Sequence, residues 1–185
     1  MTGNKRLGGW VGVAGVAVVV AGTALAGALP AQGEVSTRAV EARQITLRLA
    51  SDPGQVANVA GASQANGANI IQWPLSRTTN ERWEPEASLD GYYRFKSINS
   101  GKCLNVAGGG NTNGTQVIQY TCGGLPNELW KLVPKGIGHQ IVSKESGKCL
   151  NVAGGVGKGR SLIQYTCTTG VANDVWLAVW EPDNR

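Results

Sequence analysis

The sequence Asn105-Val-Ala-Gly108 occurs three times in this chain, with its other copies at Asn58-Val-Ala-Gly61 and Asn151-Val-Ala-Gly154. Each copy leads through a loop rich in Gly and Asn to an Ile-Gln-aromatic box, and then closes on Asn-acid-x-Trp. The closing tryptophans, which are 47 and 46 residues apart, are Trp83, Trp130 and Trp176. A repeat of this length is one supersecondary unit that cannot bury its apolar face alone. The three copies are therefore predicted to complete one core together.

Each copy has the pattern of several short strands. Ile45, Leu47 and Leu49 alternate with polar residues, as in a half-buried strand. Turns that contain glycine follow this strand and its two counterparts, at Gly54, Gly101 and Gly147. About four short strands per copy, with no periodicity typical of helices, predict an all-β domain. The domain is expected to close on itself, because closure buries each apolar face and removes free sheet edges.

These motifs resemble those of the ricin B-type lectin family. The similarity rests on Ser100-Gly-Lys-Cys-Leu-Asn-Val106, on Gln119-Tyr-Thr-Cys122 and on Asn127-x-x-Trp130, the last in the place of the family's QxW motif. The resemblance implies a β-trefoil of three pseudo-symmetric repeats of about 46 residues. It also implies that the three closing tryptophans pack in the core around the threefold axis.

The start of the chain has the pattern of a secretory signal. Residues 1–31 combine Lys5 and Arg6 with a run of Gly, Ala and Val and with the small residues Ala26-Gly-Ala28. We therefore predict a signal peptide over residues 1–31, a polar linker over 32–42 and the lectin-like domain over 43–182. A retained membrane anchor is the alternative, because the apolar run is long enough to span a bilayer. The favoured prediction is a secreted, extracellular protein with no membrane contact after cleavage.

The charge balance argues against a nucleic-acid partner. Removing Lys5 and Arg6 with the signal leaves 15 basic and 12 acidic residues, a net charge of +3. The basic residues are scattered singly, so no basic face is available for phosphate groups. We expect a monomer that does not bind nucleic acid.

Four cysteines occur in two pairs, one in each of the last two copies: Cys103 with Cys122, and Cys149 with Cys167. The first copy has Val56 and Leu75 at the matching places, so both members of its pair are absent together. This predicts one disulfide inside each of the last two copies. Each bridge is worth about 3 kcal/mol in the chain-entropy account and persists in an oxidising compartment. A zinc site is disfavoured, because no C-x-x-C spacing occurs and His139 is the only histidine.

No catalytic constellation is evident. A hydrolase needs a nucleophile with its base, or two carboxylates at a defined separation, and His139 has no obvious partner. The loop from Gly154 to Ser161 resembles a phosphate loop at first sight, but Gly159 rather than Ser or Thr follows Lys158. We predict a protein that is not an enzyme and that uses no cofactor or metal.

The resemblance implies a sugar pocket in each repeat, made by the box aromatic, an acidic residue after the first cysteine, and an Asn near the final Trp. By position, the counterparts here are Asn58, Trp73 and Asn80, then Asn105, Tyr120 and Asn127, then Asn151, Tyr165 and Asn173. Strand alternation independently places the aromatics on the face opposite Val117 and its equivalents. A ring there offers a stacking surface for a sugar, with surface packing as the alternative.

Asn replaces the family's Asp in every copy, so a carboxylate becomes an amide with one acceptor and one donor end. Sites weaker by a factor of about ten are expected, since hydrogen bonds to ions are stronger than neutral ones. The acids Glu81, Glu128 and Asp174 are expected to stabilise turns. The box glutamines are expected to satisfy backbone groups, and they are Gln72, Gln119 and Gln164.

The predicted function is non-catalytic binding of a glycan or polysaccharide through up to three shallow sites. One alternative is a trefoil with degenerate sugar sites that binds a protein, as protease inhibitors of this fold do. The others are an envelope-anchored structural domain and a lectin subunit that accompanies a separate hydrolase.

Overall fold

The computed structural model describes residues 44–170 and 172–182. The predicted signal peptide and linker lie outside these residues. The first repeat contributes β1 (Gln44–Leu49), β2 (Asp52–Val59), β3 (Ile70–Pro74) and β4 (Trp83–Ala87). The second contributes β5 (Tyr93–Ser97), β6 (Cys103–Val106), β7 (Val117–Tyr120) and β8 (Trp130–Lys135). The third contributes β9 (Gly138–Ser143), β10 (Cys149–Val152), β11 (Leu162–Tyr165) and β12 (Trp176–Glu181).

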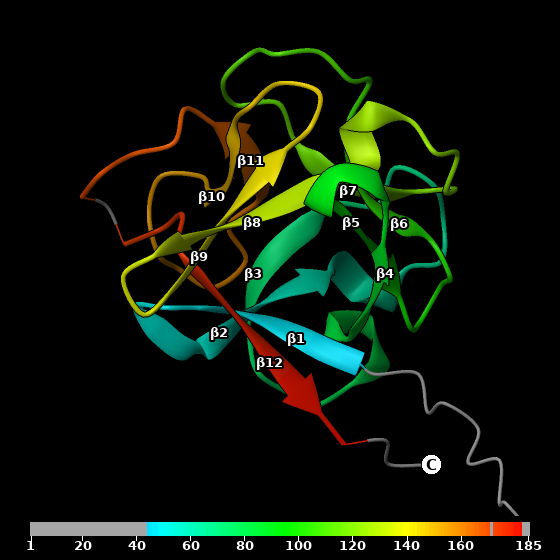
Figure 1. Cartoon of the computed structure of the whole chain (residues 1–185). Coiled ribbons are helices and arrows are strands. Elements are labelled where there is room, and N and C mark those ends of the chain that lie inside the picture. Colours follow the sequence, from blue (N-terminus) through cyan, green and yellow to red (C-terminus); the bar gives the residue numbers. More distant parts are fainter. Residues whose placement is uncertain (1–43, 171, 183–185) are drawn as a thin grey trace, which may run out of the picture. The chain divides into compact units, whose positions relative to one another are not determined.

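Six of these strands close into a barrel. Strand β1 pairs with β4 and β12, β5 pairs with β4 and β8, and β9 pairs with β8 and β12. Figure 1 shows β1 and β12 side by side, so the first and last strands of the domain complete the ring. The closed, all-β prediction is confirmed, with two barrel strands from each repeat, and the fold is the expected β-trefoil.

The other six strands form three hairpins, β2–β3, β6–β7 and β10–β11. Isolated bridges join each hairpin to the other two: Asn69 with Ile118, Ile71 with Ser161, and Gln116 with Ile163. The four short 3-10 helices between described strands are η1 (Ala60–Ala62), η2 (Thr79–Glu81), η3 (Leu89–Gly91) and η4 (Pro126–Glu128). No helix of the described residues is long and apolar enough to cross a membrane.

The three closing tryptophans are the largest fully buried side chains among the residues that the structure describes. Each indole Nε1–H donates to a backbone carbonyl of its own repeat, that of Ala57, Leu104 or Leu150, over 3.2, 2.9 and 3.0 Å. An indole needs such a partner when it is buried. The predicted core role of these residues is therefore confirmed, and the carbonyl partners fix where each ring can lie.

Glu181 ties β12 to β1 at the closure of the barrel. Its Oε1 accepts hydrogen bonds from Thr46 Oγ1 (2.7 Å) and Arg48 Nη2 (2.5 Å). Burial raises the pKa of the Glu181 carboxyl, but the bonds from Arg48 and Thr46 and the charges of Arg48 and Arg82 lower it by more. The pKa therefore lies below the ordinary value of 4.5.

Trp130→Ala is expected to lower the free energy of unfolding by about 3–5 kcal/mol, because it leaves a cavity and an unpaired carbonyl. Denaturant unfolding under oxidising conditions measures this loss. Trp130→Phe should lose less, and Ile137→Ala, at a position that is 80% exposed, should lose almost nothing. A Trp130→Ala protein as stable as the Ile137→Ala control would contradict the core assignment.

Glu181 should also make the domain less stable in acid. Its folded-state pKa lies below the unfolded value, so its contribution is complete above pH 4.5 and is lost as the pH falls through the folded pKa. The free energy of unfolding of the wild type and of Glu181→Gln should therefore differ at pH 7 and converge below pH 4.5. A difference that is constant with pH would show that the carboxylate charge does not contribute.

Candidate functional site

The three hairpins place the predicted site residues. In the second repeat, Cys103 lies opposite Tyr120 and Asn105 lies opposite Ile118. Because opposed residues of an antiparallel pair point to the same face, the first Asn and the aromatic share the face that points away from the core. The same register places Asn58 opposite Ile71 and Asn151 opposite Ile163. The predicted direction of the box aromatics is confirmed, and Tyr120 and Tyr165 are 48% and 43% exposed.

The two asparagines of each repeat form a hydrogen-bonded pair. The second Asn donates from Nδ2 to Oδ1 of the first over 2.8, 2.9 and 2.9 Å in the three repeats. The same Nδ2 donates to the backbone carbonyl of Val59, Val106 or Val152. A carbonyl can only accept, so this second bond fixes the orientation of the amide. The order of the motifs along the sequence did not predict that the two asparagines bond to each other, because they are 22 residues apart.

The first repeat differs from the other two in how its amides are satisfied. Thr78 Oγ1 donates to Asn80 Oδ1 over 2.6 Å, and Asn58 Nδ2 donates to Glu81 Oε2 over 3.3 Å. In contrast, Asn127 Oδ1 and Asn173 Oδ1 are buried without a partner in the part of the chain that the structure describes. The two site asparagines of the first repeat therefore have more of their amide groups paired within the protein than those of the second and third repeats.

A cavity lies against the site residues in two of the repeats. In the second repeat it has a volume of about 500 Å³ and is lined by Asn105, Gly108, Ile118, Tyr120, Thr121, Cys122, Gly123, Leu125, Asn127 and Glu128. In the first repeat it has a volume of about 370 Å³ and is lined by Asn58, Gly61, Ala62, Ile71, Trp73, Ser76, Thr78 and Asn80. All three predicted residues of each of these repeats contribute to its cavity. Volumes of this order are typical of small-molecule sites.

The acid before each closing Trp is buried and holds the loop that lines the site. Glu128 Oε1 and Oε2 accept from the backbone N–H groups of Gly123 and Gly124, and Oε1 also pairs with Arg94 Nε over 3.0 Å. Glu81 accepts from the N–H groups of Ser76 and Arg77 in the same way. Asp174 accepts from Thr168 N over 3.0 Å. The predicted turn-stabilising role of these acids is confirmed.

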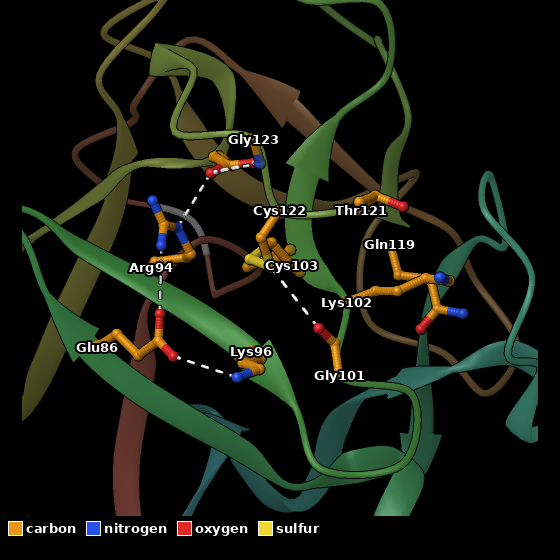
Figure 2. Close-up of a disulfide and its surroundings, with 12 residues drawn as sticks. Glu86, Arg94, Lys96, Gly101, Lys102, Cys103, Gln119, Thr121, Cys122 and Gly123 are labelled. Atoms are coloured by element: carbon orange, nitrogen blue, oxygen red, sulfur yellow. Dashed lines mark hydrogen bonds and ion pairs between the residues drawn. A yellow bond between two sulfur atoms is a disulfide. The ribbon is translucent and has the colours of Figure 1, made fainter.

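Both predicted disulfides are present and brace the same region. They are Cys103–Cys122 and Cys149–Cys167. Figure 2 shows Cys103 and Cys122 between Arg94 and Gly101, with Gly123 next along the chain. Arg94 also pairs with Glu86 Oε2 over 3.3 Å, so the ion pairs continue from the site loop to β4. The loop that follows Tyr120 is therefore held both covalently and electrostatically.

The box glutamines join each repeat to its neighbour. Gln119 Nε2 donates to the carbonyls of Ser63 and Ala65, and Gln164 Nε2 donates to those of Gly110 and Thr112. Gln72 is the acceptor rather than the donor, because its Oε1 accepts a hydrogen bond from Gly157 N over 3.0 Å. The expected role of these glutamines toward the backbone is confirmed, and their partners lie in another repeat.

The loop contacts beside the aromatics were not evident from the sequence. Asn66 Oδ1 accepts from Thr121 N and Oγ1, and Asn113 Oδ1 accepts from Thr166 N and Oγ1. At the third junction Lys158 precedes Gly159, as Asn66 and Asn113 precede Gly67 and Gly114, and its Nζ lies 4.5 Å from the centre of the Trp73 ring. Lys158 does not line the cavity of the first repeat, so the cation steadies the ring from outside that cavity.

The arrangement contains no metal cluster, since the described residues include no group of three or more His, Cys, Asp or Glu that could hold an ion. What it offers chemically is an exposed ring, an amide pair and a shallow cavity. Groups of these kinds are chemically suited to a polyhydroxylated ligand, through ring stacking and hydrogen bonding.

Residues 34–120 and 88–165 match a family model described as ricin-type β-trefoil lectin domain-like. A designed threefold-symmetric protein, ThreeFoil, is 34% identical with a TM-score of 0.70, over 74% of this chain and 97% of that chain. An exo-β-1,3-galactanase from Clostridium thermocellum is 28% identical with a TM-score of 0.70, over 76% of this chain and 30% of that chain.

The Rhizoctonia solani agglutinin shares the fold at 18% identity, with a TM-score of 0.67 over 77% of this chain and 98% of that chain. No curated protein matches the sequence. The family model and these structures agree with the trefoil that the strand pairing forms.

Glu128→Gln is expected to lower the free energy of unfolding by about 2 kcal/mol, because an NH2 group then faces two backbone donors and a guanidinium. Denaturant unfolding measures this loss. Glu145→Gln is the matched control, since it makes the same chemical change at an exposed carboxylate and should be neutral. Equal stability of the two variants would show that the buried carboxylate does not hold the site loop.

Proposed function

Since this chain belongs to the family of ricin-type β-trefoil lectin-like domains, we propose that it is an exported, non-catalytic protein that binds carbohydrate at its repeat sites. The observation that carries this proposal is the threefold recurrence of an outward-facing aromatic ring beside a hydrogen-bonded Asn pair, with the rings of Tyr120 and Tyr165 exposed and that of Trp73 half-buried. A protein-binding loop of the inhibitor type needs no such recurrence. Sugar sites account for it, because each repeat can bind a unit of the same ligand.

Each site is proposed to work by stacking and by amide hydrogen bonds. In the second repeat, the Tyr120 ring borders the cavity and covers the C–H face of a sugar. Asn105 Oδ1 already accepts from Asn127, so its Nδ2 is the end left for a ligand oxygen. An amide donor there favours sugar oxygens that act as acceptors. This differs from a carboxylate, which can only accept from sugar hydroxyls.

Weak single sites favour a polymeric ligand. A shallow neutral site has a dissociation constant on the order of millimolar, or about −4 kcal/mol. A polysaccharide that engages two sites of one molecule gains avidity through its effective concentration. We therefore propose a polysaccharide or a multivalent glycan as the physiological ligand. The activity of the clostridial galactanase relative nominates β-1,3-galactan as the first polymer to test.

The two disulfides support export, because such bonds persist in oxidising compartments. The signal-like pattern of residues 1–31 supports the same location. Extracellular action suits a polysaccharide ligand. We further propose that the protein acts as a monomer.

The test is retention of the oxidised protein on insoluble β-1,3-galactan, xylan and cellulose, with bovine serum albumin as the control protein. Retention that free oligosaccharide competes away is the expected result. The proposal would be contradicted if the folded, disulfide-bonded protein bound none of these polysaccharides and no glycan on a glycan array. That result would direct the search to protein partners.

Tyr120→Ala is expected to weaken retention severalfold without unfolding the domain, because stacking on an aromatic ring contributes about 1 kcal/mol or more. Tyr120→Phe should retain most of the affinity, since it keeps the ring. The matched control is Ile137→Ala, which removes an exposed apolar side chain from the turn between β8 and β9. Undiminished retention by folded Tyr120→Ala, Trp73→Ala and Tyr165→Ala proteins would rule out these sites.

A further inference from the structure

The site of the second repeat continues into a second cavity. This neighbour has a volume of about 280 Å³ and is lined by Gly108, Gly109, Gly110, Leu125, Pro126, Asn127 and Glu145. Gly108, Leu125 and Asn127 line both cavities, so the two are contiguous. The side chain of Leu125, which is 61% exposed, stands between them. Glu145 comes from the third repeat, in the turn between β9 and β10.

The corresponding place in the first repeat is bridged by hydrogen bonds. Asn99, the counterpart of Glu145, donates from Nδ2 to the Ala62 carbonyl over 2.9 Å. Asn99 Oδ1 accepts from Thr79 Oγ1 over 3.3 Å. Ala62 and Thr79 are the counterparts of Gly109 and Pro126. One side chain of the second repeat thus ties together the two edges of the space beside the first site.

The junction between the third and first repeats is also bridged. Ser51 Oγ donates to the Ala172 carbonyl over 2.7 Å. Ala172 is the counterpart of Pro126, and Lys144 stands where Ser51 does. The Lys144 amine instead lies 4.9 Å from the centre of the Tyr92 ring. At two of the three junctions, a side chain of one repeat therefore hydrogen-bonds to the backbone of a neighbouring repeat beside the candidate site.

The residues at the open junction cannot form the bridge of the first repeat. A carboxylate has no donor for the Gly109 carbonyl, and Pro126 has no hydroxyl for Glu145. Among the residues that the structure describes, Glu145 has no ion-pair or hydrogen-bond partner, and it is exposed. The changes at both edges leave an open space with a free acceptor at its rim.

We propose that the second repeat holds an extended site for a neutral oligosaccharide, with two adjacent sugar units on either side of Leu125. The first unit stacks on Tyr120, and the second lies over Gly109 and Pro126. Glu145 accepts hydrogen bonds from neighbouring hydroxyls of the second unit. Glycines at three lining positions let the sugar approach the backbone closely, and two of them, Gly109 at φ +71° and Gly110 at φ +88°, adopt a conformation that glycine favours.

This proposal rests on carbohydrate binding by the repeat sites, and it adds the class of ligand that one of them takes. A chain of at least two neutral units is preferred over a single sugar. An acidic second unit is disfavoured, because its carboxylate would face Glu145. The space beside the first site is closed by the Asn99 bridge, so the preference for chain length distinguishes the second site from the first.

The test is titration calorimetry of the protein with β-1,3-linked galacto-oligosaccharides and β-1,4-linked xylo-oligosaccharides of one to four units. At least one series should gain about tenfold in affinity from one unit to two or three, as expected for a charge-assisted hydrogen bond. The double variant Glu145→Asn with Pro126→Thr rebuilds the bridge of the first repeat. It should lose this gain and keep the affinity for the single sugar. Glu145→Gln should lose part of the gain.

Tyr120→Ala separates this proposal from the general one. If the wild type binds a single unit and longer chains equally and Tyr120→Ala weakens both to the same extent, the sugar site is retained and the extension is overturned. The extension is also overturned if the folded double variant keeps the full gain, and circular dichroism checks its fold. A wild type that binds no member of either series would contradict the extended site, while retention on another polysaccharide would leave the general function standing.

Discussion

In each repeat, a buried glutamine side chain hydrogen-bonds to the backbone of another repeat. Gln119 is fully buried, yet its two acceptors are loop carbonyls 54 and 56 residues away. Leaving such a side chain unpaired in the interior costs about 1–3 kcal/mol, so a repeat without its neighbour is incomplete in polar as well as apolar terms. The loop that Gln164 holds includes Gly110, which lines the cavity beside the second site, and the buried acid Glu128 lines that site itself.

Much of the fold follows from local pattern. Alternation along the β-strands placed Tyr120 outward, and the paired absence of cysteines at Val56 and Leu75 identified both disulfides. The Asn pairs and the junction bridges did not follow, because the residues that they join are far apart in sequence. Ser51 and Ala172, for example, are 121 residues apart. Periodicity shows which way a side chain points but not what it meets across a junction.

The repeats are most alike in the core and least alike where they touch. At two junctions an Asn accepts from the N–H of a Thr, whereas Pro74 stands in the place of that Thr at the third and has no N–H to offer. There Lys158 on the Trp73 ring replaces the lost bonds. Pro74 in place of Thr removes the donor that an Asn would need, and Lys158 in place of that Asn needs no donor, because it contacts the ring instead. The same kind of paired change, at Glu145 and Pro126, separates the open junction from the bridged one, so differences between the sites arise at the boundaries of the repeats.

The pairing of β1 with β12 has a topological consequence. Gln44 lies opposite Glu181, so the two ends of the barrel's chain leave from the same edge. A short peptide joining them would allow the domain to be circularly permuted, with new ends in the turn between β4 and β5, while every strand kept its partner. For the same reason, the domain could be inserted into an exposed loop of a host protein, because its entry and exit points match those of a single loop.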